Sequence, residues 1–265
     1  MTYSCHLPHP HLSRYIRFYW VLESDAPYVH RATADGCAEL VFHVNGDFVG
    51  ADASGVFVDA APATLRGPAS QYSRYSCDSS FSIFGVYIYP YALRHLFNIP
   101  ANVLGNTEHS LSTILGANGN ALTEKLQEAR DLAARIKVVE HYFFSALRKH
   151  ESTDFERAEW MIQQVINCRG RLSIGELAAE SFLSTRQLER QFVSAAGFTP
   201  KLYTRIIRFQ SAAAQYGTEL SMTQLAYECG YYDQAHFIHD FRQFSGFTPR
   251  QYFSGLSEGT AWRDV

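Results

Sequence analysis

The chain has 265 residues, of which 46% are hydrophobic and 18% are charged, and its net charge is −3 at pH 7. These proportions exclude a mainly disordered or fibrous chain, and the length suggests two domains of about 100–150 residues each. Residues from 151 onward hold 11 basic and 13 acidic side chains. Charge alone therefore gives no attraction to nucleic acid, and DNA binding has to be argued from motifs.

The five cysteines lie far apart and form no CxxC pair, and the first residues lack a basic stretch followed by an apolar one. We therefore predict neither a disulfide framework, nor a zinc ribbon, nor a secretory signal. No apolar run reaches the ~18 residues that a membrane helix needs. We expect a cytoplasmic protein with no membrane partner.

Short aromatic or β-branched segments, separated by turn residues, fill the chain up to about residue 89. They are residues 15–22, 40–44, 56–58 and 81–89. This pattern predicts a β-rich domain. Pro90 ends the last strand, residues 91–97 have room for about two helical turns before Pro100, and residues 115–120 are expected to form a loop.

Apolar residues recur every three or four positions from Leu122 to Leu147. This spacing predicts one long helix over residues 121–149, which closes an N-terminal domain of residues 1–150. The apolar stripe either covers the β-rich part or pairs two subunits in a homodimer. We expect residues 150–154 to form the hinge to the second domain.

The second half contains an internal repeat. Residues 197–203 (GFTPKLY) recur as residues 246–252 (GFTPRQY) at an offset of 49, with five identities in seven positions. Upstream, residues 172–178 match residues 220–226 at an offset of 48. The two copies differ by one residue in the turn between their helices, which indicates a duplicated helical module.

Each copy has the pattern of a helix-turn-helix unit. Ser173 and Ser221 are candidate N-caps, and the small residues Ala178 and Ala226 allow the close approach of two crossing helices. The pattern predicts a first unit over about residues 173–196 and a second over about 221–245, within a C-terminal domain of residues 151–256. Between them, residues 199–215 predict a connecting helix of roughly 25 Å, which could hold two recognition helices about one DNA turn apart.

The second helix of each unit presents a polar face rich in arginine, glutamine and histidine. Arginine can bind guanine and glutamine can bind adenine through two hydrogen bonds each, so these faces predict contacts with the bases of double-stranded DNA. The candidate residues are Arg186, Gln187, Glu189 and Arg190 in the first copy, and Gln234, His236, His239, Arg242 and Gln243 in the second.

Residues from about 155 to 253 resemble the DNA-binding domain of the AraC family of bacterial transcription regulators. The stretches that carry the resemblance are LERQF at 188–192, GFTP at 197–200, and GYYDQAHF at 230–237 followed by Phe241, Arg242, Gly246, Pro249 and Tyr252. The resemblance implies that Ala235 also lies where bases are read, and that the helix starts at Thr199 and Thr248 meet phosphates. The chain departs from the family at Phe182, where a turn glycine is usual, so we expect that turn to be built differently.

The first half more loosely resembles the β-rich sensory domains of the same family, through RFYW at 17–20, DGCAELVF at 35–42 and FGVYIYP at 84–90. The resemblance implies a cupin-like barrel or sandwich that binds a small-molecule effector. Glu39, His43 and Arg66 are the polar residues that we expect to orient it. The whole chain is then an α+β two-domain transcription regulator, with RNA polymerase as a further partner.

An enzyme is the rival class. A cupin-type metal enzyme needs several histidines and a carboxylate that converge inside the barrel, and an alkyl-acceptor DNA-repair protein needs clustered zinc-bound cysteines. His6, His9 and His11 lie beside Cys5, but Pro8 and Pro10 hold this segment extended. We therefore expect no metal site, no cofactor and no enzymatic activity.

Overall fold

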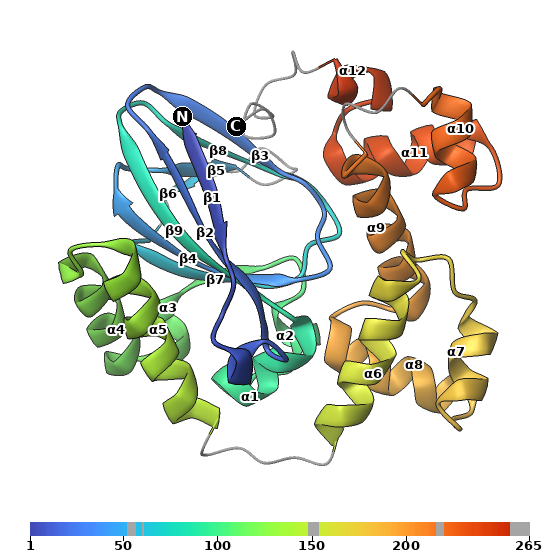
Figure 1. The fold of residues 1–265 in the computed structure, drawn as a ribbon, viewed down its shortest axis with the longest axis horizontal. Helices are drawn as coiled ribbons and strands as arrows, with labels where there is room; N and C mark the ends of the chain where they lie inside the picture. The colour runs from blue at the N-terminus through green and yellow to red at the C-terminus, as the bar shows by residue number, and fades with distance from the viewer. Residues whose placement is uncertain (52–56, 60, 148–153, 216–219, 255–265) are drawn as a thin grey trace.

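The computed structural model describes residues 1–51, 57–59, 61–147, 154–215 and 220–254 (Figure 1). A β-rich domain with attached helices occupies the first half of the chain, and a domain made only of helices occupies the second. The predicted α+β two-domain fold is confirmed. None of the described helices is both long and apolar enough to cross a lipid bilayer.

Within the described residues, the strands form two antiparallel sheets. The six-stranded sheet has the order β1 (Thr2–His6), β2 (Ile16–Ser24), β9 (Phe81–Ile88), β4 (Ala38–Asn45), β7 (Ala63–Arg66) and β10 (Glu108–Ser110). The four-stranded sheet has the order β3 (Tyr28–Ala32), β8 (Ser73–Cys77), β5 (Val49–Ala51) and β6 (Phe57–Asp59).

The six-stranded sheet buries apolar side chains on both faces. Alternation along β4 sends Leu40 and Phe42 into a core shared with the helices, whereas Val41 packs with side chains from β8 and β9 in a smaller cluster. On β9, Gly85 lies opposite Trp20, and an added Cβ there would lie 2.1 Å from Cε2 of that ring. The position therefore requires glycine, because the indole ring occupies the space of a side chain.

Short helices cover one face of this sheet (Figure 1). They are the 3₁₀ helices η1 (Pro10–Leu12) and η2 (Pro90–Ala92), followed by α1 (Leu93–Phe97), α2 (Ala101–Leu104), α3 (Leu111–Leu115), α4 (Ala117–Glu128) and α5 (Leu132–Leu147). The helical turns predicted before Pro100 are confirmed as η2 and α1.

Two of the predictions for this region are wrong. Residues 115–120 are not a loop, because Ser110 caps α3 and the chain turns at Gly116 (φ 60°) directly into α4. The helix predicted over 121–149, whose last two residues lie outside the described ranges, is a pair of helices. Ala129 is extended (ψ 122°), and the Asp131 carboxylate accepts the N–H of Ala134 at 2.8 Å to start α5.

The C-terminal domain consists of α6 (Asp154–Asn167), α7 (Ile174–Glu180), α8 (Thr185–Ala196), α9 (Pro200–Ala213), α10 (Met222–Glu228), α11 (Gln234–Ser245) and α12 (Pro249–Phe253). Helix α9 joins the two units, as predicted from residues 199–215. The predicted hinge at 150–154 lies outside the described residues except for Asp154, which begins α6.

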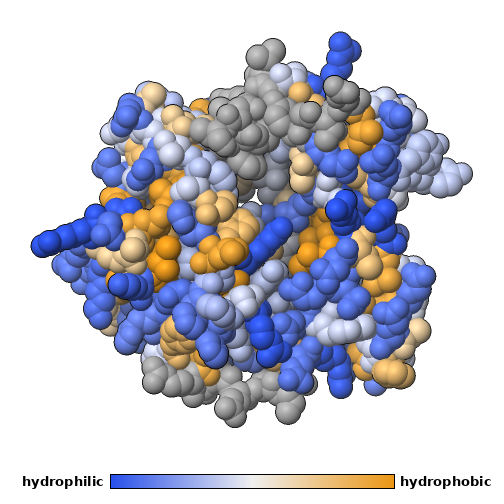
Figure 2. Space-filling model, viewed as in Figure 1, coloured by the Kyte–Doolittle hydropathy of each residue, from blue (hydrophilic) through white to orange (hydrophobic). Residues whose placement is uncertain are grey.

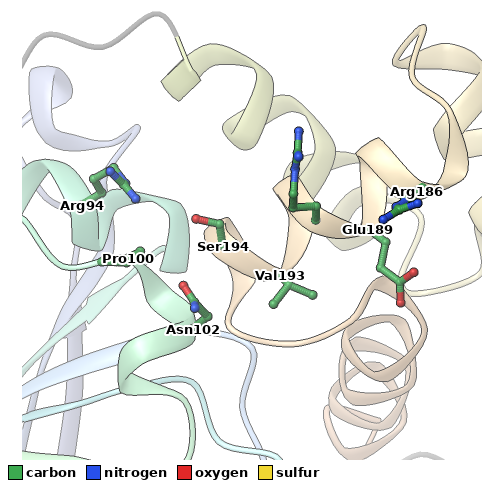
Figure 3. A pocket seen from close by; sticks show the side chains of 8 residues that line it. Arg94, Pro100, Asn102, Arg186, Glu189, Val193 and Ser194 are labelled. Atoms are coloured by element: carbon green, nitrogen blue, oxygen red, sulfur yellow. The ribbon is translucent and has the colours of Figure 1, made fainter.

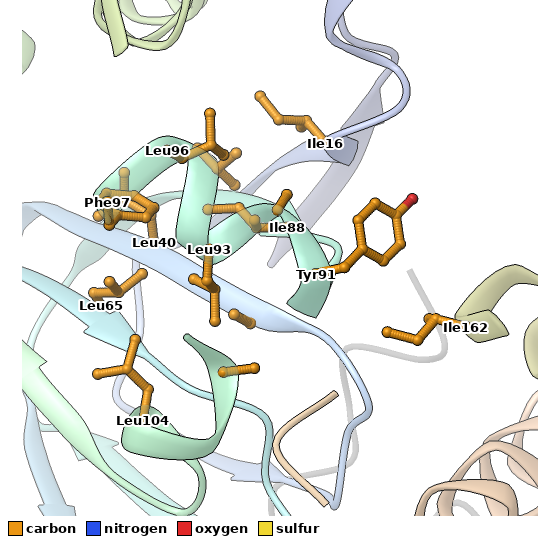
Figure 4. Packing of buried hydrophobic residues seen from close by; sticks show 14 of the residues in the cluster. Ile16, Leu40, Leu65, Ile88, Tyr91, Leu93, Leu96, Phe97, Leu104 and Ile162 are labelled. Atoms are coloured by element: carbon orange, nitrogen blue, oxygen red, sulfur yellow. The ribbon is translucent and has the colours of Figure 1, made fainter. Parts of the chain in front are cut away.

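The two domains share one apolar core. Tyr91 of η2 lies beside Ile162 of α6 (Figure 4). Phe155 of α6 belongs to the same buried cluster, and the Tyr91 ring meets the Phe155 ring edge-on at 5.4 Å between centroids. At the other end of the junction, the Ala34 N–H donates to the Phe244 carbonyl at 2.8 Å. Figure 2 shows apolar patches on both domains, separated by hydrophilic side chains.

Candidate nucleic-acid interface

The first helix-turn-helix unit is held at both helix starts by side chains. Ser173 and Glu176 form a capping box at α7, and Ser184 and Gln187 form another at α8. Gln187 was predicted to read bases, but its Oε1 accepts from the Ser184 hydroxyl at 2.7 Å. The side-chain oxygen of Gln187 is therefore occupied, and its amide nitrogen is the atom left to contact a base.

The turn between α7 and α8 has the same backbone as the turn in the second unit. Phe182 has φ 55° and Gly230 has φ 76°, and both lie in the left-handed region. The next N–H in each turn bonds back to the matching alanine, Ala178 at 3.2 Å and Ala226 at 2.9 Å. The expectation that Phe182 builds a different turn is therefore wrong. The phenyl ring is 96% exposed, so the bulky residue is accommodated by pointing into solvent.

The outer face of α8 lies across from the N-terminal domain. Arg186, Glu189 and Arg190 are exposed and line an open groove of about 600 Å³. Arg94 of α1 and Asn102 of α2 line the opposite side (Figure 3). The predicted base-reading side chains of the first unit are thus brought together on one face, and that face is flanked by the other domain.

The outer face of α11 faces away from its own core. Asp233 caps the helix by accepting the N–H of His236 at 2.7 Å. Ala235, His239 and Arg242 are exposed, and their spacing of four and three residues places them on one face of the helix. Four of the predicted residues of this unit have partners within the protein. Gln234 accepts from Thr223 at 3.3 Å, and Gln243 accepts from Arg205 at 2.8 Å. His236 and His239 lie 3.6 and 3.4 Å from the Asp240 carboxylate.

Thr199 and Thr248 begin α9 and α12 as predicted. Their hydroxyl groups accept the N–H of Leu202 and of Gln251, each at 3.3 Å. Because the first N–H groups of a helix lack partners within it, both positions present donors that an anion such as a phosphate can accept from.

Three cationic side chains in a row on α9 were not singled out in the sequence analysis. Lys201, Arg205 and Arg208 are spaced i, i+4 and i+7, and they line an open groove together with His236 and His239 of α11. The helical spacing was a signal that could have identified them, because residues at these intervals share a face.

In the N-terminal domain, the structure brings together two of the three predicted effector residues. Arg66 Nη1 lies 3.3 Å from the Glu39 carboxylate, and Arg66 Nε lies 3.2 Å from the Glu108 carboxylate. The guanidinium group covers the Tyr75 ring at 4.3 Å, and the Tyr75 hydroxyl donates to Glu108 at 2.8 Å. Tyr75 belongs to the other sheet, so this cluster bridges the two sheets. Tyr75 and Glu108 were not predicted.

Burial controls the ionisation of this cluster. It raises the pKa of Glu39 to about 7, although the positive charge of Arg66 opposes the shift. His43, the third predicted residue, bonds to the Ala61 carbonyl at 2.9 Å and stacks on Phe48. Burial lowers its pKa. Neither of these two contacts joins His43 to Glu39 or Arg66.

The described residues contain no group of three or more histidine, cysteine or acidic side chains placed to hold a metal ion. Cys5 and His6 lie on the edge strand β1, whereas His9 stacks on His11 beyond the strand, at 5.3 Å between ring centroids.

Two stretches of the chain match known domain families. Residues 177–255 match a family described as a helix-turn-helix domain. Residues 4–110 match a domain of unknown function (DUF6597). The first match covers the two units from within α7 onward, and the second covers the two sheets from within β1 onward.

Curated relatives include the HTH-type transcriptional activator RhaS of Escherichia coli (strain SE11), which is 37% identical over 82 residues. The RhaS of Klebsiella pneumoniae (strain 342) is 35% identical over 82 residues. The match covers 30% of this chain and 30% or 29% of those proteins.

Solved structures of ToxT from Vibrio cholerae share the fold over nearly the whole chain. An apo variant from strain SCE256 has a TM-score of 0.51 with 15% identity, and it covers 90% of this chain and 98% of ToxT. A 1.65 Å structure has a TM-score of 0.50 with 11% identity, and covers 97% and 100%. Residues 177–255 thus match a helix-turn-helix domain family, and the chain as a whole has a two-domain fold similar to that of ToxT, in agreement with the resemblance to AraC-type regulators noted from the sequence.

Proposed function

We propose that the protein is a transcription regulator that binds a specific sequence in double-stranded DNA, in the cytoplasm of a bacterium, and that it is not an enzyme. The observation that carries the proposal is the duplicated unit: two capped recognition helices, α8 and α11, each present an exposed polar face and are joined by one helix of 14 residues. At 1.5 Å per residue this helix is roughly 21 Å long, which suits two helices that enter successive major grooves.

Arg186 and Arg190 in the first unit, with Ala235, His239 and Arg242 in the second, are the residues proposed to meet base edges. They are exposed, and arginine is the side chain best suited to guanine. In this proposal the Glu189 carboxylate accepts a hydrogen bond from the amino group of cytosine. Gln187, Gln234, His236 and Gln243 take part through the donors that their internal bonds leave available, and Thr199 and Thr248 bind phosphates through the helix starts.

We also propose that the N-terminal domain binds a small-molecule effector at the cluster of Glu39, Arg66 and Glu108. Charged side chains that are mostly withdrawn from water, 16% exposed for Glu39 and for Arg66, are suited to orient a polar group of a ligand. A ToxT structure contains (E)-4-(8-methylnaphthalen-1-yl)but-3-enoic acid and has a TM-score of 0.50 to this chain. That likeness supports the idea that a fold of this kind takes a small organic ligand.

We also propose that the protein forms a homodimer and that it binds RNA polymerase. The boundary between the domains at residue 150 is likewise a proposal, supported by the family matches, which end at residue 110 and begin again at residue 177.

Selection of duplexes from a random DNA library by the full chain tests the main proposal. The expected result is an enriched sequence with two short conserved blocks about one helical turn apart, because each recognition helix reads one major groove. A library that shows no enrichment over several rounds at moderate salt contradicts sequence-specific binding. A metabolite screen on the full chain, read as a rise in melting temperature, tests the effector, since a ligand that binds only the folded state stabilises it.

A further inference from the structure

The open groove between α9 and α11 has a volume of about 470 Å³, and three cationic side chains of α9 line it. Its lining includes Lys201, Arg205 and Arg208 from α9, and His236 and His239 from α11. This contrasts with the chain as a whole, whose net charge is −3. Local charge, rather than the total, decides where an anion binds.

The cations lie on the side of α9 that faces away from the N-terminal domain. Tyr203 and Ile207 face that domain, because an added Cβ at Gly36 would lie 2.8 Å from the Tyr203 ring and 3.0 Å from Ile207 Cδ1. At 100° per residue, Lys201 and Arg205 lie opposite Tyr203 on the helix. The N-terminal domain therefore leaves this face of α9 open.

Among the residues that the structure describes, Asp240 is the acidic side chain that lines the groove, and its charge is already balanced within the protein. Asp240 is fully buried, and Arg205 binds both of its oxygens, at 2.7 and 3.2 Å. His239 Nδ1 lies 3.4 Å from the same carboxylate. Asp240 thus acts as a positioning residue that fixes Arg205 and the histidine rings, while the charge that reaches solvent is positive.

The groove lies directly beside the face of α11 that is proposed to read bases, and His239 belongs to both. A helix in the major groove, which is about 12 Å wide, has a phosphate strand along each side. On the α9 side of α11, that strand would lie along Lys201 and Arg205. We propose that this groove binds the phosphate backbone of DNA beside the second recognition helix. This inference rests on the proposed function and extends the interface to the connecting helix.

Lys201 is the residue to test, because it is exposed and the bonds that hold Asp240 do not involve it. The substitution Lys201→Ala is compared with Lys125→Ala, an exposed lysine on α4 of the N-terminal domain. The probes are a duplex enriched from the random library and an unrelated duplex of equal length. Fluorescence anisotropy of the full chain gives the binding constant from 50 to 300 mM salt.

The expected result for Lys201→Ala is a salt dependence, as log K against log salt, that is shallower by about 0.9 on both duplexes, because one phosphate contact is lost. Affinity falls roughly three- to tenfold at low salt, and the preferred sequence is unchanged. Lys201→Arg retains the wild-type slope, and Lys125→Ala leaves it unaltered. An unchanged slope for Lys201→Ala, or an equal loss of affinity in both alanine variants, contradicts the proposal that this groove binds phosphates. A wild-type chain that binds neither duplex overturns the proposed function as well.

Discussion

The two helix-turn-helix units have the same internal design but different surroundings. Both have a serine cap on the first helix, a left-handed residue in the turn and a glycine with positive φ after the second helix. Yet α8 faces Arg94 and Asn102 of the N-terminal domain across its groove, whereas α11 is flanked by the cations of α9. Duplication of the sequence therefore fixes the geometry within each unit, and the docking of the other domain decides what each recognition face can approach.

The cores of the units also differ. The inward side chains of α8 are Leu188, Phe192 and Ala196, whereas those of α11 include Phe237, Phe241 and Phe244. Aromatic pairs add stabilisation beyond the area that they bury. The second unit therefore depends on ring packing within its own domain, and the first depends more on the core that it shares with the N-terminal domain.

Equivalent core substitutions should show the largest difference. Phe241→Ala is expected to lower the free energy of unfolding of the C-terminal domain by about 3–5 kcal/mol, because it leaves a cavity among four rings. Those rings are Phe209, Phe237, Tyr252 and Phe253. Phe192→Ala should lower the free energy of unfolding by less, because the Phe192 ring packs against the Tyr203 ring, at 5.4 Å between centroids, instead of within a group of four rings. Urea unfolding followed by the helical signal measures both, and a larger loss for Phe192→Ala contradicts the contrast.

Matched substitutions on the recognition faces should act on separate parts of the DNA site. Arg190 and His239 occupy equivalent positions at an offset of 49. Arg190→Ala is expected to weaken binding by about 1–3 kcal/mol and to relax the preference at one base position, because a contact with a base edge is lost. His239→Ala should relax a position about one helical turn away. Competition with duplexes altered at single positions maps these effects, and Arg157→Ala on α6 is the control. Loss of preference at the same base in both variants would refute the arrangement.

The two turns offer a test of backbone strain. Gly230→Ala is expected to destabilise the C-terminal domain by about 1–2 kcal/mol, because a side chain is disfavoured in the left-handed region. The new Cβ would also lie 2.9 Å from Arg171 Cγ. Gly175→Ala on α7 is the control with the opposite sign. A Cβ added at Gly175 would lie 4.0 Å from its nearest neighbour, the Ser173 hydroxyl oxygen. Alanine also favours a helix over glycine by roughly 0.5–1 kcal/mol. Thermal unfolding of both variants should therefore give shifts of opposite direction.

The smallest effect is expected in the other turn. Phe182→Gly should stabilise the chain by about 0.5–1 kcal/mol, because it relieves the left-handed conformation of an exposed phenylalanine. A decrease in stability would show that the ring makes a favourable contact in solution. Measured beside Gly230→Ala, this variant tells whether the two turns store comparable strain.

Local signals in the sequence were enough to predict the helical domain. Serine caps, apolar spacing and the repeated GFTP stretches all act within a few residues, so Ser173, Ser221, Thr199 and Thr248 begin helices as predicted. The same local logic failed between Leu126 and Ile136. Both α4 and α5 pack apolar side chains into the same core, so the apolar spacing continues across the turn that separates them. The cap at Asp131 was the signal that could have revealed the turn.

Contacts between distant residues could not be read in this way. Nothing near Tyr91 in the sequence indicates that its ring packs on Phe155, and so the groove that flanks α8 was not predicted. In the N-terminal domain, the link of Glu39 through Arg66 to Glu108 and Tyr75 depends on how strands from two sheets face each other. The capping role of Gln187 was available from the serine three residues before it.

The hydrogen bond from the Ala34 N–H to the Phe244 carbonyl joins the β-rich domain to the end of the second recognition helix through main-chain atoms alone. Every residue except proline supplies the same donor. The side chains at both positions can therefore change without removal of this hydrogen bond. An alanine scan would pass over it, and proline at position 34 is the substitution that removes the donor.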